Sequence, residues 1–354
     1  MNRGRILGFA ALCLVCVLGA GAYVRHALQR AAAPQDKSPS STAAIDTVAA
    51  GTTPVLDAQS SPLLLFRNTS VDPSYGRLAV APLENVTDRR IVPTLSCERV
   101  DYAAGRGVCL TATRGVTTTY SAIVFDQNFQ PLFTLPLGGV PSRVKVARDG
   151  SVAAVSVFVS GHSYAGGDFS TLTSVIDLQR GTYVVPNFEQ LKVWSGSQPF
   201  EAVDRNFWGV TFAHNADTFY ATVASGGRTH LIRGTLTDRE ARVLRDDVEC
   251  PSLSPDNKRL AFKLRVDDKL GPVHWRLAVL DLGTLEYIPL AETRSVDDQV
   301  TWLDDEQIMY ALPAAESGSA EMNTWVVDSH GHGTPRMLVP QAYSAIIWPP
   351  STPG

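Results

Sequence analysis

The sequence predicts an all-β protein, a six-bladed β-propeller preceded by one N-terminal apolar segment. Three observations support this fold class. Short β-rich runs alternate with turn signals from Leu63 onward, without a convincing amphipathic helix. A two-part pattern then recurs about every 45–55 residues, which is the size of a propeller blade. Finally, an apolar run near the end of the chain could complete the first repeat.

Residues 1–30 predict a signal anchor. Met1–Arg5 is short and basic, and Ile6–Val24 is a run of 19 residues without charge. At about 1.5 Å per residue, such a helix spans about 28 Å, close to the thickness of a bilayer core. Ala20-Gly21-Ala22 is also a plausible small-residue cleavage site, so a cleaved signal peptide stays open. Either outcome exports the rest of the chain.

Residues 31–61 predict a flexible linker. They are rich in Ala, Ser, Thr, Pro and Gln and have few large side chains, so they cannot bury enough surface to fold. The propeller is expected over residues 62–349, with 350–354 as a short tail.

The charge balance argues against nucleic-acid binding. All the acidic residues lie beyond residue 30, and residues 31–354 carry 27 basic and 35 acidic groups, a net charge of −8. Such a body repels phosphates, and no basic stripe with interleaved aromatic residues counters this.

Two of the five cysteines lie in the apolar segment, which leaves Cys97, Cys109 and Cys250. Cys97 and Cys109 are close enough in sequence to bridge adjacent strands in an exported domain. Three unpaired buried thiols are the alternative. A turn centred on Ala104-Gly105 would place Cys97 opposite position 112 rather than 109, which speaks against the bridge.

The repeat consists of a turn with an apolar strand, followed by a second apolar strand that often ends in aspartate. Markers in the second strand are separated by 45, 51, 56, 48 and 47 residues; they are Val80, Phe125, Ile176, Ile232, Leu280 and Val327. One blade cannot bury both its faces, so several must pack around an axis. The expected blades are 63–95, 96–138, 139–200, 201–246, 247–292 and 293–340.

The first blade lacks an inner strand of its own. Tyr343–Trp348 (YSAIIW) could supply it and close the ring by pairing the two ends of the domain, which removes an exposed sheet edge. We expect a monomeric propeller. The alternative fold is a pair of β-sandwiches, which explains the period less well.

Blade five carries a family resemblance. Leu253–Phe262 (LSPDNKRLAF), followed by Leu277–Leu282 (LAVLDL), resembles the blade motif of TolB-like propellers. The match is sharp in blade five, fair in blades three and six and looser elsewhere, and it covers residues 63–348. The whole chain resembles a membrane-anchored bacterial TolB-like translocation protein, although no separate N-terminal α/β domain is evident. The resemblance implies a propeller that binds proteins, and it implies no catalytic residues.

The links that enter the inner strands predict a binding mouth. In propellers these links gather at one end of the central channel, and here they also contain Arg99, Arg143 and Asn206. We expect an acidic funnel for a basic peptide segment or a cation, formed by Glu98, Asp204, Glu249, Asp297 and Asp298. Ordinary solvated loop acids are the alternative.

No motif predicts catalysis, a cofactor or a metal. Gly161–Gly167 (GHSYAGG) is similar to the nucleophile elbow of prolyl oligopeptidases, but it joins two strands inside a blade, whereas the elbow needs a strand, a turn and a helix. His330-Gly331-His332 lacks the spaced partners of a zinc site.

We therefore expect a membrane-tethered module that binds a protein or peptide in the cell envelope, with its propeller outside the cytoplasm and with no enzymatic activity. Two alternatives stay open. One is an exported hydrolase or lyase with carboxylates at the propeller mouth as general acid and base. The other is a sensor of small molecules or glycans.

Overall fold

The computed structural model describes Cys16, Gly21, Asp46, Thr47 and residues 62–159, 170–266, 273–315 and 320–348. The chain divides into two compact units, Met1–Ala43 and Ala44–Gly354, and the propeller lies in the second. Apart from Cys16 and Gly21, the expected anchor lies outside the described residues, as do the expected tail and most of the expected linker. Among the residues that are described, no helix is both long and apolar enough to span a membrane.

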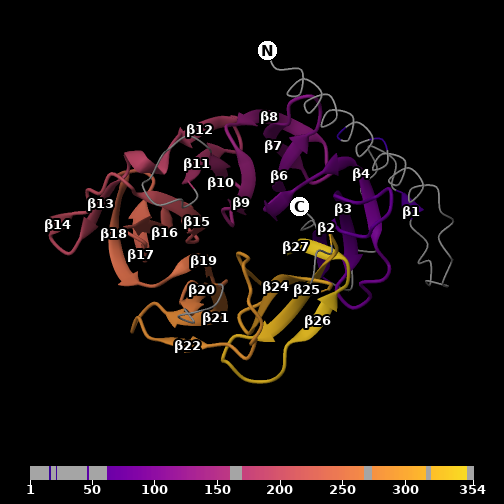
Figure 1. The fold of residues 1–354 in the computed structure, drawn as a ribbon. Coiled ribbons are helices and arrows are strands. Elements are labelled where there is room, and N and C mark those ends of the chain that lie inside the picture. Colours follow the sequence, from indigo (N-terminus) through magenta and orange to yellow (C-terminus); the bar gives the residue numbers. More distant parts are fainter. Residues whose placement is uncertain are drawn as a thin grey trace, which may run out of the picture. The chain divides into compact units, whose positions relative to one another are not determined.

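Six β-sheets stand around a central axis, which confirms the six-bladed propeller (Figure 1). The four main strands of each blade, taken from the axis outward, are antiparallel to their neighbours, and hairpins join those that are consecutive in the chain. The first three blades contain these strands: in blade one, β27 (Ala342–Trp348), β2 (Leu63–Asn68), β3 (Arg77–Pro82) and β4 (Arg90–Ser96); in blade two, β5 (Arg99–Ala103), β6 (Arg106–Thr113), β7 (Thr119–Asp126) and β8 (Pro131–Leu137); in blade three, β9 (Val140–Val146), β10 (Val152–Val159), β11 (Ser170–Asp177) and β12 (Thr182–Val185).

The other three blades repeat this plan, and blade four is larger. They contain these strands: in blade four, β15 (Asn206–Phe212), β16 (Thr218–Ser225), β17 (Arg228–Thr235) and β18 (Glu240–Asp246), extended by β13 (Lys192–Ser195) and β14 (Gln198–Pro199); in blade five, β19 (Glu249–Leu253), β20 (Arg259–Val266), β21 (His274–Asp281) and β22 (Tyr287–Pro289); in blade six, β23 (Thr301–Trp302), β24 (Gln307–Pro313), β25 (Met322–Asp328) and β26 (Arg336–Val339).

The core consists of six apolar clusters, one at each junction between neighbouring blades. Blades three and four share the largest, in which Phe188, Phe207 and Phe219 meet edge-on or tilted. The five other clusters fill the remaining junctions in the same way. Each sheet therefore buries both faces only because it has a neighbour on either side, as the repeat predicted.

The aspartates that end the third strands cap the turns that follow them. Asp126 Oδ1 accepts bonds from the N–H groups of Asn128 and Gln130, and Asp281 Oδ1 accepts from Gly283 and Thr284. These bonds from Thr284 and Gly283 lower the pKa of Asp281. The repeated acid thus builds the blade, because a short carboxylate side chain at a strand end satisfies backbone donors of a tight turn.

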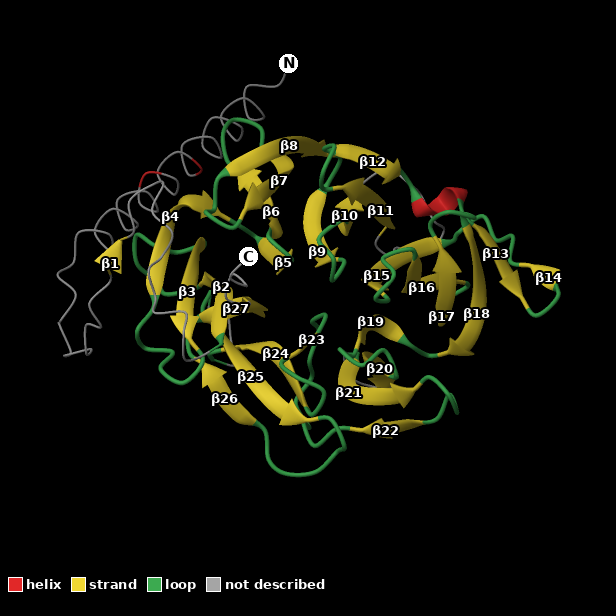
Figure 2. Ribbon diagram, turned by 180° about the vertical axis from the view of Figure 1, so that it is seen from behind, coloured by secondary structure: helices red, strands yellow, loops and turns green. Residues whose placement is uncertain are grey.

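The last strand closes the ring. Strand β27 pairs antiparallel with β2, with Leu63 opposite Trp348 and Leu65 opposite Ile346. Trp348 packs against Tyr102 and Phe129 of blade two, so the closing strand also contributes to the next junction. The prediction that residues 343–348 supply the inner strand of blade one is confirmed. In Figure 2, β27 lies beside β2 in a single sheet.

Two details differ from the sequence-based boundaries. Residues 192–199 belong to blade four rather than blade three, because β13 pairs in parallel with the outer strand β18. A short 3-10 helix, η1 (Phe188–Gln190), makes this crossing and buries Phe188. In addition, β1 (Asp46–Thr47), within the expected linker, pairs in parallel with Arg90-Ile91 of β4.

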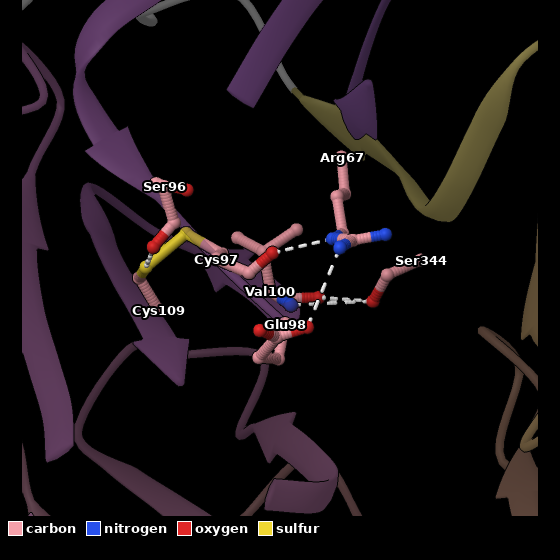
Figure 3. The surroundings of a disulfide bond; sticks show 7 residues. All are labelled: Arg67, Ser96, Cys97, Glu98, Val100, Cys109 and Ser344. Carbon is pink, nitrogen blue, oxygen red and sulfur yellow. Dashed lines mark hydrogen bonds and ion pairs between the residues drawn. A yellow bond between two sulfur atoms is a disulfide. The ribbon is translucent and has the colours of Figure 1, made fainter. Parts of the chain in front are cut away.

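A disulfide joins Cys97 to Cys109, with a Cα–Cα distance of 5.3 Å. The hairpin pairs Val100 with Cys109, so an extended ladder would indeed place residue 97 opposite 112. Cys97 does not follow this register because it precedes β5, which begins at Arg99. The N–H of Cys97 instead donates to Gly76 O in blade one, and its side chain reaches across to the second strand of blade two. Figure 3 shows this link between the two blades. Cys250 is a free, buried thiol.

We expect the closing strand to carry a large part of the stability. Ile346 is 4% exposed and packs in the cluster between blades one and two. Ile346→Ala should lower the free energy of unfolding by about 2–5 kcal/mol, as measured by urea unfolding, because it leaves a cavity. The matched control Val140→Ala lies at a 48% exposed position and should change it by less than about 0.5 kcal/mol. Equal effects of the two substitutions would contradict a closed ring.

The disulfide should stabilise the propeller by restricting the unfolded chain. Its partners are 12 residues apart, and a loop of this size corresponds to about 3 kcal/mol in the chain-entropy model. Adding a reductant to the native protein should therefore lower its urea midpoint. The double variant Cys97→Ser/Cys109→Ser should start at the lower midpoint and not respond to reductant. A response of that variant would show that the reductant acts elsewhere.

Candidate functional site

The central axis has two chemically different ends. At the link end, the connections from each outer strand enter the next inner strand. At the hairpin end, the inner strands turn back into the second strands. The predicted mouth residues precede or begin inner strands, so they belong to the link end.

Ion pairs fill the link end. Lys263 of β20 lies 2.5 Å from Asp297 and 3.8 Å from Glu249, measured from Nζ to the carboxylate oxygens. The ammonium group of Lys263 also stands 4.3 Å above the Trp275 ring. Arg143 approaches Asp297 from the opposite side of the axis, at 3.9 Å. Two of the predicted acids therefore share one buried cation.

The other link-end acids are also paired, with one exception. Asp298 forms a 2.6 Å ion pair with Arg99, and both side chains are largely buried. Glu98 contacts Arg67 at 3.3 Å, beside the disulfide in Figure 3, and Arg114 at 2.8 Å. The structure thus links Glu98, Glu249, Asp297 and Asp298 into neighbouring pairs around the axis.

Asp204 takes no part in this network. Its carboxylate accepts bonds from Ser225 Oγ at 2.6 Å and from Gly226 N at 2.7 Å, in the hairpin of its own blade. These bonds lower the pKa of Asp204.

The expected acidic funnel therefore also contains cations. Cations face four of its five acids, because Arg99 and Arg143 come from the same links. Arg67 and Lys263 reach in from second strands. Ligand binding at these acids stays a prediction.

The side-chain carboxyl group of Glu249 has a raised pKa. Its side chain is buried, and burial raises its pKa from 4.5 to about 7, against the attraction of Lys263. The neighbouring carboxylate of Asp297 contributes to this raised pKa. The link end is thus a compact ion cluster that gains or loses a proton near neutral pH.

The hairpin end holds a cavity of about 680 Å³. This hairpin-end cavity is lined by the second halves of the inner strands and by the turns after them. Every inner strand contributes at least two residues to the lining, among them Asp101, Lys145, Thr211, Ser252, Thr301 and Ile346. Ligand pockets span about 300–1,000 Å³ and combine an apolar wall with a few polar groups, which is the character of this site.

A buried charge pair lies in the cavity wall. The distance from Lys145 Nζ to Asp101 Oδ2 is 3.6 Å, and the same oxygen accepts a 2.7 Å bond from Val146 N. Burial raises the pKa of Asp101, while Lys145 and the Val146 N–H lower it.

Exposed polar side chains form the rim of the cavity. Arg148 Nη1 donates to Pro255 O at 2.8 Å and lies 2.9 Å from His214 Nε2, which joins the hairpins of blades three, four and five. Asp304 of blade six is exposed on the rim. The cavity therefore opens to solvent at the hairpin end.

Sequence analysis placed the candidate site at the link end and did not identify this cavity. The signal for this cavity in the sequence is weak. It consists of single polar residues in the inner strands, such as Lys145 between two valines and Thr301 before Trp302. Lys263 gave a clearer signal, since it interrupts the apolar run LAFKL of a buried strand.

Comparisons with known proteins support the fold. No protein-family model and no curated protein matches the sequence. Among solved structures, TolB from Acinetobacter baumannii is similar, with 14% identity and a TM-score of 0.52 over 81% of this chain and 66% of that chain. A nidogen/laminin complex is similar with 11% identity and a TM-score of 0.52, covering 81% of this chain and 97% of that chain.

These likenesses define a class, the β-propellers with six blades. The chain is structurally similar to TolB, as blade five predicted, and it spans just under two thirds of the TolB chain that it matches. At such identities the likeness shows the fold alone, and no family assignment follows.

The link-end cluster predicts a pH-dependent stability. The pKa of Glu249 is about 7 in the folded state and about 4.5 in the unfolded state, so the folded protein binds the proton more tightly. The contribution of Glu249 to stability is therefore present below about pH 4.5 and is lost as the pH rises to about 7. It amounts to about 3 kcal/mol at most.

Urea unfolding from pH 5 to pH 8 measures this effect. The stability of the native protein relative to Glu249→Gln should fall across the range, because glutamine does not titrate. The control Glu240→Gln, at an outer-strand residue paired with Lys192, should give a constant difference. A constant difference for Glu249→Gln as well would contradict the raised pKa.

Proposed function

We propose that this chain is an exported, membrane-tethered β-propeller that binds a protein or peptide partner in the cell envelope. The partner inserts a segment into the hairpin-end cavity. The observation that carries this proposal is the cavity itself: about 680 Å³, formed by all six blades and open to solvent at a polar rim.

Two observations support a location outside the cytoplasm. The Cys97–Cys109 disulfide is a type of bond that persists in oxidising compartments. The uncharged run Ile6–Val24 has the length of a membrane-spanning helix and follows a basic start, which is typical of an export signal. The same run provides the tether if it is retained.

The cavity chemistry favours binding over catalysis. A general acid or base needs a carboxyl group that is free to exchange a proton with a substrate. Here Asp101 accepts from Val146 N, Asp304 caps the N–H groups of Glu306 and Gln307, and Asp305 accepts from Asp256 N. The string at residues 161–167 lies outside the described residues.

Site-specific photo-crosslinking in intact cells tests the proposal. A photoreactive phenylalanine analogue replaces His214 or Asp304, two exposed rim positions on different blades. Both variants should capture the same partner. The matched control carries the analogue at Val116, which is fully exposed in a hairpin at the link end, and should not capture it.

A second variant connects capture with the cavity. Thr301→Phe fills the hairpin-end cavity from its wall and should abolish capture at His214 while the propeller still unfolds cooperatively in urea. The same products at Val116 as at the rim, or capture that survives Thr301→Phe, would refute binding in the cavity.

A further inference from the structure

Strand β9 places cationic donors at two depths of the axis. Lys145 lines the hairpin-end cavity, and Arg143 lines a smaller cavity of about 30 Å³ directly beneath it. The two cavities share Asp101, Thr301 and Ile346 as well as Lys145 in their linings, so they are adjacent. Among the described residues, the ammonium group of Lys145 has one ion pair, at 3.6 Å, which leaves donor capacity unused.

Two buried polar atoms of residues that line these cavities lack a partner in the described part of the chain. They are Arg143 Nε and the hydroxyl oxygen of Ser252, whose side chain is 1% exposed. An unsatisfied buried donor is unfavourable, so a ligand that brings an acceptor is favoured here. Arg148 adds a further guanidinium at the rim, engaged through one terminal nitrogen.

The carboxylates of the cavity are already committed to backbone donors. Asp101, Asp304 and Asp305 each accept at least one backbone N–H bond. Lys145 is also the more accessible member of its pair: its side chain is 22% exposed, against 7% for Asp101.

One acceptor narrows the class of ligand. Asn257 Oδ1 is buried in the cavity wall and has no partner among the described residues. It needs an N–H group, whereas Lys145 needs an anion. The end of a polypeptide offers both, since its terminal carboxylate follows directly on backbone amides.

We propose that the hairpin-end cavity binds the free C-terminal carboxylate of a partner polypeptide, with Lys145 as its cationic partner. This inference rests on the proposed function and deepens it. The Ser252 hydroxyl belongs to the lining of the same cavity and can add a donor to the carboxylate. A cavity of this size admits the end of a chain and excludes a folded domain.

Two synthetic pools of random hexapeptides test the inference. Both carry an N-terminal dye; one pool ends in a free carboxylate, and the other is amidated. Peptides retained by the full-length protein are then titrated singly by fluorescence anisotropy. Amidation should weaken binding by about tenfold or more, because a hydrogen-bonded charge pair is lost.

Variants at Lys145 provide the matched comparison. Lys145→Met should weaken the free-carboxylate peptides about tenfold and leave amidated peptides unchanged, while Lys145→Arg should retain the preference for the carboxylate. The control Lys192→Met removes an exposed lysine of blade four and should change neither.

The outcomes separate the two proposals. Equal binding of both pools, lost in Thr301→Phe, would overturn the carboxylate and keep the peptide-binding cavity. No binding in either pool would overturn both. N-acetyl amino acids that bind as tightly as the hexapeptides would show that the ligand is a small carboxylate, and would overturn the polypeptide end.

Discussion

The pairing of β2 with β27 is the constraint on which the rest of the structure depends. Each blade is a sheet of about four strands that cannot bury both faces by itself, and six such sheets share six apolar junctions. Without β27, blade one would lack its inner strand and would present an unpaired edge. Trp348 and the Cys97–Cys109 disulfide then tie the same blade to blade two.

In the closed ring, six inner strands face one another across the axis. Their side chains fill the space at the two ends of the axis differently. At the link end, Arg99, Arg143 and Lys263 approach acids from other blades and fill the space with ion pairs. At the hairpin end, shorter side chains such as Ser252 and Thr301 leave a cavity. The distribution of long charged and short polar side chains along the inner strands therefore decides which end can admit a ligand.

The sequence predicted most of the fold and little of the site, for physical reasons. Strand periodicity, aspartates that cap turns and the run YSAIIW are local signals, so the six blades and their closure could be derived from them. Residues 192–199 were misplaced because a parallel pairing with β18 leaves no local signal. The site needs distances between blades: the links show Asp297 and Asp298, but they do not show that Lys263 and Arg99 lie against them.

The pairing of β27 with β2 also determines when the propeller can close during synthesis of the chain. A ribosome delivers Leu63 long before Ile346, so the edge of β2 waits through the synthesis of five blades before its neighbour emerges. Contacts this distant in sequence form slowly, and an unpaired edge is a template for association with other chains. The interval between the synthesis of β2 and that of β27 is thus the period in which this chain depends most on the chaperones of its compartment.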